Sequence, residues 1–493
     1  MRYFFAFLLI AICITADCNL LKVEASNRPI DEKKVDEIVE QGMRNYDIPG
    51  LSLGIVKGDR VVYLKGYGVA DDSGREVTPQ TPFMLGSVSK SFTALAVMQL
   101  AEQGKIDLDT AVRRYLPELR LEDPGGARQV TVRDLLNQTS GISTYDGRDI
   151  LTAGNQSLEE VVRRQSNLRL TKPAGTAFQY SNTNYILLGE IVRRISGLDY
   201  EQYIEDRIFD RLDMRNSFTR KSEAETNGLA SGYQSVFGKM ISTDPKIHRS
   251  SVPAGYIISS AEDMTHYVIA QMNGGTYLHA AVISSEGMKA MHQSSAVFPY
   301  GMGWFTDART ISHGGDTENF HSDVIMIPES EWAIVVLMNT NDALKTKLYG
   351  NVYEQLSYRI MNVVSDGELF FMGIPEPTEF GNVDLYANSL FILVSLWIVW
   401  STYGLIKMRS SYKGITLKFV IVFLATVLFH IVLPLAVIVR VPKLASAPWG
   451  TIFNYMPGIG HALMFFSLAL LLIGLMNIYL RMGQIRKGYS KVQ

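Results

Sequence analysis

The sequence contains a serine followed three residues later by a lysine, in residues 87–90 (SVSK). Residues i and i+3 share one face of a helix, so the Lys90 amine can approach the Ser87 hydroxyl. A serine at a helix N-terminus meets the positive end of the helix dipole, and a desolvated lysine can act as a base. The segment therefore indicates nucleophilic catalysis, although residues 410–413 (SSYK) repeat its spacing and Ser87 could simply cap a helix.

Residues 180–182 (YSN) carry side chains suited to the same chemistry and follow a turn-rich loop, residues 172–175 (KPAG). The Tyr180 phenol could relay a proton, and the Asn182 amide could hold a substrate carbonyl. The alternative is a hydrogen-bonded loop, and residues 386–388 (YAN) have the same form.

Residues 313–315 (HGG) precede the last predicted strand region of the domain. Two adjacent glycines allow a substrate backbone to approach a sheet edge closely. The alternative is a simple turn.

These residues must be positioned by a mixed set of strands and helices. Residues 51–56 and 60–69 are β-rich runs separated by a Lys-Gly-Asp turn signal, which predicts a hairpin. Residues 89–103 have apolar side chains at helical spacing and end at a glycine, which predicts a helix directly after Ser87. Residues 332–338 are a continuous apolar run typical of a buried strand. Strands at both ends with helices between them predict an α+β fold, in which helices cover an antiparallel sheet.

The chain of 493 residues is too long for one ordinary domain. A basic residue followed by an apolar stretch predicts a secretory signal peptide in residues 1–25, the alternative being an uncleaved anchor. The two cysteines, Cys13 and Cys18, lie in or beside this segment, so the domain beyond it has no disulfide and no cysteine metal site. We assign residues 30–364 to one domain and the Pro- and Gly-rich residues 365–384 to a linker. Few contacts should cross such a linker, so we expect the domain to work without the C-terminal segments.

Residues 385–482 contain three apolar stretches, each long enough to cross a bilayer. The basic residues between the first two stretches are Lys407, Arg409, Lys413 and Lys418. Basic residues also follow the third stretch, in and before the tail of residues 483–493, whereas only Arg440 and Lys443 lie between the second and third. Basic loops face the cytoplasm, so the first loop and the tail are predicted inside and the large domain outside the cell. The net charge of −2 gives no field that would favour nucleic acid as a partner.

The three segments occur in the order, and at roughly the separations, of the serine β-lactamase and penicillin-binding protein superfamily. Residues 83–92 (FMLGSVSKSF) resemble the nucleophile segment of its class C-like branch, and residues 131–142 (TVRDLLNQTSGI) and 300–304 (YGMGW) resemble its other signature stretches. The resemblance covers roughly residues 31–358, and with three spans added the whole chain is similar to the FmtA-like penicillin-binding-related proteins. It implies a β-lactamase/transpeptidase-like fold, with an all-helical cluster beside the sheet.

The resemblance also implies roles for the candidate residues. Ser87 would be the acylated nucleophile, Lys90 and Tyr180 would shuttle its proton, with the identity of the base left open, and Asn182 would orient the substrate amide. The backbone amides of Ser87 and of a residue on the strand after the HGG segment would form the oxyanion hole.

By the same resemblance, His313 and Gly315 would line the substrate strand. The family commonly has Lys-Thr-Gly here, and its lysine recognises a substrate carboxylate. An unperturbed histidine has a pKa of about 6.5. We therefore expect penicillins to acylate the protein slowly, and faster below about pH 6. No glutamate positioned to activate a deacylating water is identifiable from the sequence.

These features together predict a serine hydrolase of the cell membrane that acts on D-alanyl amides or esters of cell-envelope polymers and binds β-lactams weakly. The chief alternative is a penicillin-acylated sensor or scaffold without turnover, although the tail is too short for an effector domain. We expect no cofactor and no metal, since the sequence has no His-Glu-x-x-His pattern, phosphate loop or dinucleotide fingerprint. The oligomeric state is left open.

Overall fold

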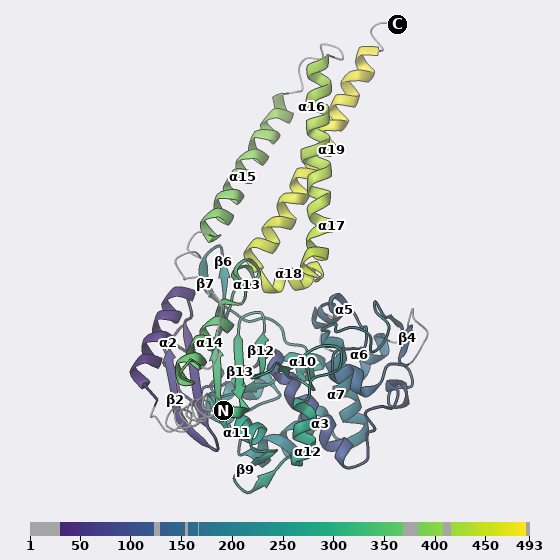
Figure 1. Ribbon diagram of the computed structural model, residues 1–493. Coiled ribbons are helices and arrows are strands. Elements are labelled where there is room, and N and C mark those ends of the chain that lie inside the picture. The colour runs from purple at the N-terminus through teal and green to yellow at the C-terminus, as the bar shows by residue number, and fades with distance from the viewer. Residues whose placement is uncertain are drawn as a thin grey trace, which may run out of the picture.

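The structure is a computed structural model that describes residues 30–122, 129–152, 156–165, 167–367, 383–407 and 416–489. The predicted signal peptide, most of the linker, the loop at 408–415 and the end of the tail lie outside the described residues. A domain of strands and helices carries a stem of three long helices (Figure 1).

Six antiparallel strands form the main sheet, in the order β11-β12-β13-β14-β1-β2. The strands are β1 (Gly50–Lys57), β2 (Arg60–Gly68), β11 (Phe305–Thr306), β12 (Ile311–Asp316), β13 (His321–Ile327) and β14 (Trp332–Met338). The hairpin predicted from the Lys-Gly-Asp turn is β1–β2, and the predicted buried strand is β14. Both predictions are confirmed.

Strands β1, β13 and β14 are buried on both faces, because a helical layer covers each face of the sheet, whereas the edge strand β2 is largely exposed. The layers are α2 (Glu32–Tyr46) with α14 (Val352–Val364) on one face, and α3 (Ser89–Glu102) with α11 (Ala261–Met272) on the other. Successive side chains of a strand point to opposite faces, so Ile334 joins the core beneath α2 and α14, whereas Val335 joins the larger core around α3. The predicted α+β fold with a helix-covered antiparallel sheet is confirmed.

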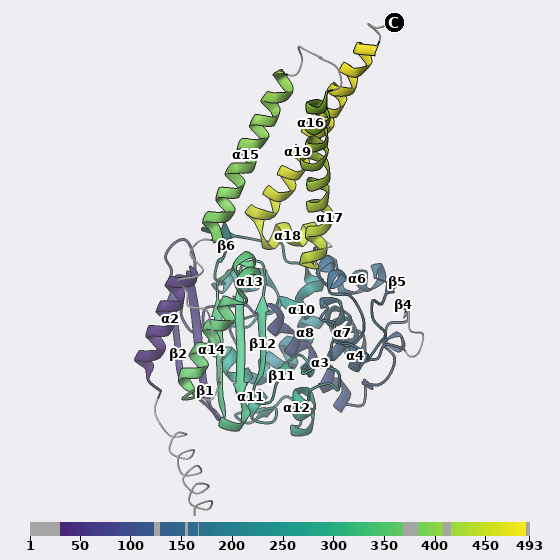
Figure 2. The ribbon, with the colours of Figure 1, turned by 45° about the horizontal axis from the view of Figure 1, so that its top comes forward.

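A cluster of short helices lies beside the sheet, around the buried helix α7, and completes the predicted β-lactamase-like architecture (Figure 2). Its helices are α4 (Val132–Leu136), α5 (Thr144–Asp149), α6 (Leu158–Arg164), α7 (Asn182–Ser196), α8 (Tyr200–Ile204), α10 (Val252–Gly255) and α12 (Ser285–His292). Smaller strands include β6 (Gly232–Val236), β7 (Lys239–Thr243) and β15 (Thr340–Asn341), and α13 (Ala343–Tyr349) follows β15.

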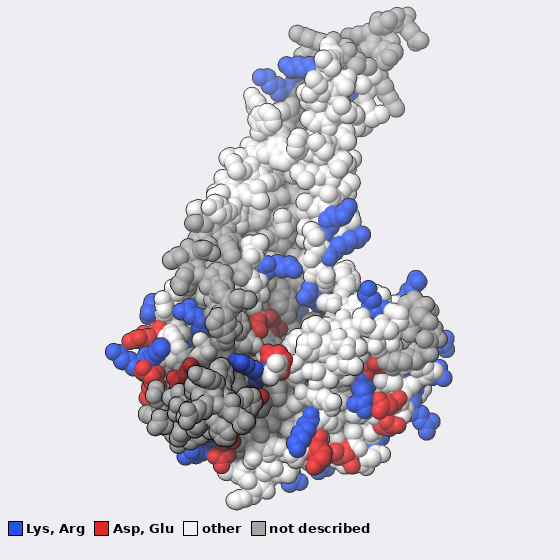
Figure 3. Space-filling view, in the orientation of Figure 1, with Lys and Arg blue, Asp and Glu red and all other residues white. Residues whose placement is uncertain are grey.

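The stem contains three helices that are long and apolar enough to cross a membrane, at Asp384–Lys407, Leu417–Ala445 and Pro457–Gly483. Its elements are α15 (Val383–Lys407), α16 (Leu417–Val427), a π-helical turn (Leu428–Val432), α17 (Leu433–Ala445), α18 (Trp449–Tyr455) and α19 (Pro457–Tyr489). The surface of the stem is white, neither basic nor acidic, along most of its length in Figure 3, with basic side chains near its far end. The three predicted spans are therefore found.

The expectation that few contacts cross the linker is wrong. The Gln234 side chain on β6 donates to the backbone oxygen of Asn454 on α18 (2.7 Å), and Asn388 on α15 donates to the backbone oxygen of Phe237 (3.1 Å). The Phe237 ring also packs edge-on against Phe391, with ring centroids 5.6 Å apart. The tip of the β6–β7 hairpin thus lies against the first and third spans, and the domain and stem share an interface.

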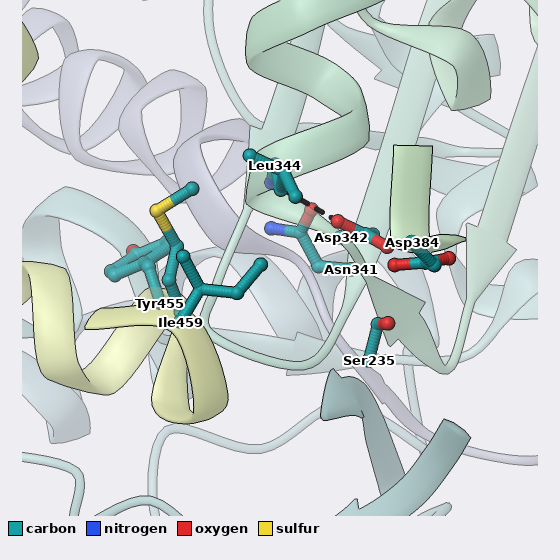
Figure 4. A pocket seen from close by; sticks show the side chains of 8 residues that line it. Ser235, Asn341, Asp342, Leu344, Asp384, Tyr455 and Ile459 are labelled. Atoms are coloured by element: carbon teal, nitrogen blue, oxygen red, sulfur yellow. Dashed lines mark hydrogen bonds between the residues drawn. The ribbon is translucent and has the colours of Figure 1, made fainter. Parts of the chain in front are cut away.

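A hollow lies at this interface, between polar side chains of the domain and side chains of the stem that include Asp384 at the start of the first span (Figure 4). It is lined by Ser235, Asn341, Asp342, Leu344, Asp384, Tyr455, Met456 and Ile459. None of the predicted site residues lines it.

Candidate active site

Ser87 lies in a single turn of 3-10 helix directly before α3. The turn is anchored where the backbone N–H of Ile257 donates to the Ser89 hydroxyl (3.0 Å). Gly86 has φ of +51°, and a Cβ atom there would stand 2.4 Å from the backbone nitrogen of Asp316. Glycine is therefore required for the nucleophile turn to approach β12 this closely.

Lys90 is completely buried on the first turn of α3, and three oxygens surround its amine. The Nζ atom lies 2.9 Å from Ser87 Oγ, 2.8 Å from Asn182 Oδ1 and 2.5 Å from the backbone oxygen of Ala254 on α10. Burial lowers the pKa of Lys90 well below its usual value.

A neutral amine has two N–H donors and one lone pair. The Asn182 and Ala254 oxygens can only accept hydrogen bonds, so they take the two N–H groups of Lys90. In the neutral form the third contact, with Ser87 Oγ at 2.9 Å, would join the lone pair to the Ser87 hydroxyl, which can donate. The arrangement suits a base that removes the Ser87 proton.

Tyr180 ends the loop before α7 and stands beside the same amine. Its ring centroid lies 4.8 Å from Lys90 Nζ, and its hydroxyl is hydrogen-bonded to the Ser87 side chain. Burial raises the pKa of Tyr180, although the hydrogen bond with Ser87 opposes the rise. The phenol is thus protonated near neutral pH and can act as a donor.

Asn182 is the first residue of α7, and α5 lies directly on this helix start. A Cβ atom at Gly147 of α5 would stand 2.5 Å from Ser181 Oγ and 2.6 Å from the Asn182 backbone nitrogen. The Ser181 N–H also donates to Gln138 Oε1 (3.0 Å). Two neighbouring segments therefore fix the orientation of the Asn182 amide.

The backbone amides of Ser87 and Asp316 form a candidate oxyanion hole. The Thr317 N–H donates to the Phe320 oxygen (3.0 Å) across the hairpin. Hydrogen-bonded and non-hydrogen-bonded pairs alternate in antiparallel strands, so the N–H of Asp316 points away from β13. The Asp316 nitrogen lies against the nucleophile turn, because a Cβ atom at Gly86 would stand 2.4 Å from it.

His313 is buried on β12, and both of its ring nitrogens have partners. Nδ1 lies 2.6 Å from the Gly314 oxygen and Nε2 lies 3.2 Å from the Tyr300 hydroxyl. An Nδ1–H tautomer that accepts from Tyr300 satisfies all three groups. Burial and the neighbouring Lys90 lower the pKa of His313 to about 3. The unperturbed pKa assumed for His313 is therefore wrong, and with a pKa of about 3 the residue gives no reason to expect faster penicillin acylation below about pH 6.

The structure brings all six predicted site residues together at one end of β12 and the start of α3: Ser87, Lys90, Tyr180, Asn182, His313 and Gly315. Of the repeated motifs, residues 386–388 lie on the first span and residues 410–413 lie outside the described residues.

Sequence reasoning missed a buried cation behind the oxyanion strand. His321 is fully buried, with Nδ1 2.8 Å from Asp316 Oδ1 and Nε2 2.8 Å from Asp323 Oδ2. Burial alone would lower the pKa of His321, but the two carboxylates raise it well above its usual value. The doubly protonated ring can thus fix the end of β12, and only the nearby acidic residues in the sequence hinted at it.

A second missed group lies beside α10, the helix that supplies the Ala254 oxygen, and includes a residue of the stem. The Tyr256 hydroxyl donates to both carboxylate oxygens of buried Glu318 (3.0 and 3.1 Å) and is hydrogen-bonded to the Tyr455 hydroxyl. Burial raises the pKa of Glu318. No sequence spacing links Tyr455 to residues of the domain so far away in the chain, so the contact required the fold.

In the part of the chain that the structure describes, no three His, Cys, Asp or Glu side chains gather so as to hold a metal ion. The chemistry described above uses only side chains and backbone amides of the chain.

The helix-covered antiparallel sheet and a serine paired with a buried lysine define the serine β-lactamase and penicillin-binding class of fold. The beta-lactamase family model matches residues 35–357, and the chain belongs to this family. Members of this superfamily are usually serine hydrolases.

Among curated proteins, the chain is similar to Protein flp of Staphylococcus aureus strain MW2, with 29% identity over 86% of each chain. It is also similar to the unguisins hydrolase ungD' of Aspergillus campestris, with 25% identity over 65% of this chain and 63% of the relative. Among solved structures, an octameric penicillin-binding protein homologue from Pyrococcus abyssi matches with a TM-score of 0.59 and 25% identity, over 73% of this chain and 81% of the other. The similarity to Protein flp extends beyond the catalytic domain, because 86% of the chain must include part of the stem.

Proposed function

We propose that the protein is a membrane-anchored serine hydrolase that forms an acyl-enzyme on D-alanyl amide or ester groups of cell-envelope polymers. The observation that carries the proposal is the buried Lys90 amine, whose Nζ atom lies within hydrogen-bonding distance of Asn182 Oδ1, the Ala254 backbone oxygen and Ser87 Oγ. A helix cap would not need a buried lysine of this kind.

In the proposed acylation step, Ser87 Oγ attacks the substrate carbonyl carbon while its proton passes to Lys90. The oxyanion that forms accepts hydrogen bonds from the amides of Ser87 and Asp316. The bond from carbon to the leaving amine or alcohol then breaks, and that group takes a proton from the Tyr180 hydroxyl, which the Lys90 ammonium replaces. Water later attacks the Ser87 ester, releases the acid and restores the hydroxyl.

The preferred substrate in this proposal carries no carboxylate at the position that His313 faces. A neutral histidine offers no fixed positive charge, because its pKa is lowered to about 3, mainly by burial. β-Lactams present a carboxylate, so we expect them to bind weakly.

The proposed location of the catalytic domain is outside the cell. It is supported by the end of α15 and the start of α16, which lie at the end of the stem far from the domain (Figure 1), because the sequence between these two spans is basic and basic connections face the cytoplasm. The boundaries of the domain, 30–364, remain a prediction.

The test is pre-steady-state hydrolysis of a chromogenic D-alanyl ester by the full chain, with mass spectrometry of the quenched protein. We expect a burst, continued turnover and an acyl adduct on Ser87 that is absent from Ser87→Ala. Ser73→Ala, which changes an exposed serine, serves as the matched control. A burst without turnover would support the sensor alternative, and an adduct that persists in Ser87→Ala would refute the assigned nucleophile.

A further inference from the structure

The connection between the second and third spans, residues 446–456, lies against the catalytic domain. Its helix α18 lies between the domain-side ends of α17 and α19 in both ribbon views (Figures 1 and 2). Arg440 and Lys443 lie near the end of α17, and α18 carries Trp449 and Tyr455. Basic and aromatic residues at the ends of spans lie at the level of the lipid headgroups. This connection is therefore at the membrane surface.

One side of α18 is bonded to α5, which supports the Asn182 segment. The Thr451 hydroxyl donates to the backbone oxygen of Arg148 (3.0 Å), and the Arg148 guanidinium donates to the backbone oxygens of Ala445 and Ser446. The residue before Arg148 is the glycine that packs on the start of α7. The connection thus supports one of the two oxygens that hold Lys90.

The other side of α18 contacts the segment that supplies the second oxygen. The Tyr455 hydroxyl is hydrogen-bonded to that of Tyr256, which follows α10 by one residue. The backbone oxygen of Ala254, in α10, accepts from Lys90 (2.5 Å). Both segments that orient the catalytic amine are therefore in contact with the membrane-surface connection.

Tyr455 also lies near two of the charged groups that lie near the catalytic tyrosine. The charges of Asp316 and Arg148 act on the hydroxyl groups of both Tyr180 and Tyr455. Burial and the Glu318 carboxylate raise the pKa of Tyr455 well above its usual value. The Tyr455 hydroxyl is therefore a protonated, polar group beside Tyr256 and Glu318.

We propose that α18 forms one wall of the substrate site, and that the substrate is an ester or amide carried in the headgroup region of a molecule anchored in the same membrane. This inference rests on the proposed function. Because α18 connects the second and third spans, it stays at the membrane surface. A substrate with apolar chains in the bilayer presents its headgroup at that depth without further ordering, whereas a soluble substrate must be captured from solution.

The test uses the full chain in vesicles and two probes with the same acyl group. One probe is phosphatidylglycerol esterified with D-alanine on its headgroup, and the other is the soluble D-alanyl ester of glycerol. The lipid probe is placed either in the vesicles that hold the protein or in separate vesicles. We expect hydrolysis in the shared membrane to be at least about ten-fold faster than in separate vesicles, because a shared membrane raises the effective concentration.

Equal rates for shared and separate vesicles, or hydrolysis of the soluble ester alone, would overturn this inference but leave the proposed hydrolase intact. Hydrolysis of neither probe, with Ser87 still reactive toward a fluorophosphonate, would overturn the proposed D-alanyl activity and this inference with it.

A pair of variants tests the wall itself. Tyr455→Ala should reduce the preference for the lipid probe over the soluble ester by about five-fold or more. This change corresponds to about 1 kcal/mol of lost interaction free energy between Tyr455 and the lipid probe. Phe453→Ala removes an aromatic ring of the same helix that packs within the stem, with its centroid 4.6 Å from that of His461, and should leave the preference unchanged. An equal change in both variants would mean that Tyr455 does not contact the substrate.

Discussion

A carboxylate in place of the Asn182 amide tests whether Lys90 acts as a neutral base. Asn182 Oδ1 lies 2.8 Å from Lys90 Nζ, so Asn182→Asp adds a negative charge there with little change in shape. Two unit charges at this distance attract by about 6 kcal/mol at an effective dielectric constant of about 20. Desolvation of the new carboxylate offsets much of this, and neighbouring opposite charges shift a pKa by about 1–3 units. We take a rise of about two units in the pKa of Lys90, or about 2.7 kcal/mol.

Acylation requires the uncharged amine, and a raised pKa keeps the amine protonated up to a higher pH. We therefore expect the acidic limb of kcat/KM for a chromogenic ester to move up by about two pH units in Asn182→Asp. The rate at neutral pH should fall by about 100-fold and recover in alkaline solution, because 1.4 kcal/mol corresponds to a factor of about ten. The measurement is the initial rate between about pH 5 and pH 10.

Two further variants separate the effect of the added negative charge from the other roles of Asn182. Asn182→Leu removes the amide without adding charge, so its loss should be similar at every pH. Asn273→Asp adds the same charge at an exposed position at the end of α11 and should leave the profile unchanged. If Asn182→Asp loses the same activity at every pH, as Asn182→Leu does, the amide acts on the substrate and the argument for a neutral Lys90 fails.

The site and the stem give three other predictions. Lys90→Ala and Tyr180→Phe serve one proton transfer, so their combined loss in log kcat should be far from additive; additive losses would assign them to separate steps. His313→Lys should raise acylation by penicillin at about pH 7.5 by roughly ten-fold and barely affect a neutral ester, while the native protein should show no acceleration at about pH 5.5 because its His313 has a pKa of about 3; equal effects on both substrates would contradict this. In intact cells, a cysteine replacing Asn227 should react with an impermeant thiol reagent and one replacing Ser411 should not, and the reverse result would invert the proposed orientation.

The sheet and the catalytic centre could be predicted from sequence because both depend on local patterns. The run at 332–338 is apolar at every position, and this identified a strand that is buried on both faces. The Ser87 and Lys90 pair depends on one helical turn, which spacing alone specifies. The convergence with Tyr180 and His313 came only from the resemblance, since these residues lie on different elements.

Burial and long-range contacts could not be predicted in this way. His313 looked like an ordinary histidine with a pKa of about 6.5, but Tyr300 and the Gly314 oxygen enclose it, and this burial lowers its pKa. The Pro- and Gly-rich composition of the linker predicted that the domain and the stem would be independent. That composition describes only the linker. It carries no information about the hairpin tip at Phe237, which contacts the spans from elsewhere in the chain.

The buried amine explains why the catalytic domain and the stem need each other in the proposed mechanism. A lysine that loses its hydration favours the neutral form, but it serves as a base only if its lone pair is aimed at the nucleophile. In the proposed mechanism, the oxygens of Asn182 and Ala254 set the direction of the lone pair. The segments that carry these two oxygens are both in contact with α18. Correct insertion of the second and third spans would then complete the orientation of Lys90, so a chain that is not inserted in a membrane should acylate slowly even when its domain is folded.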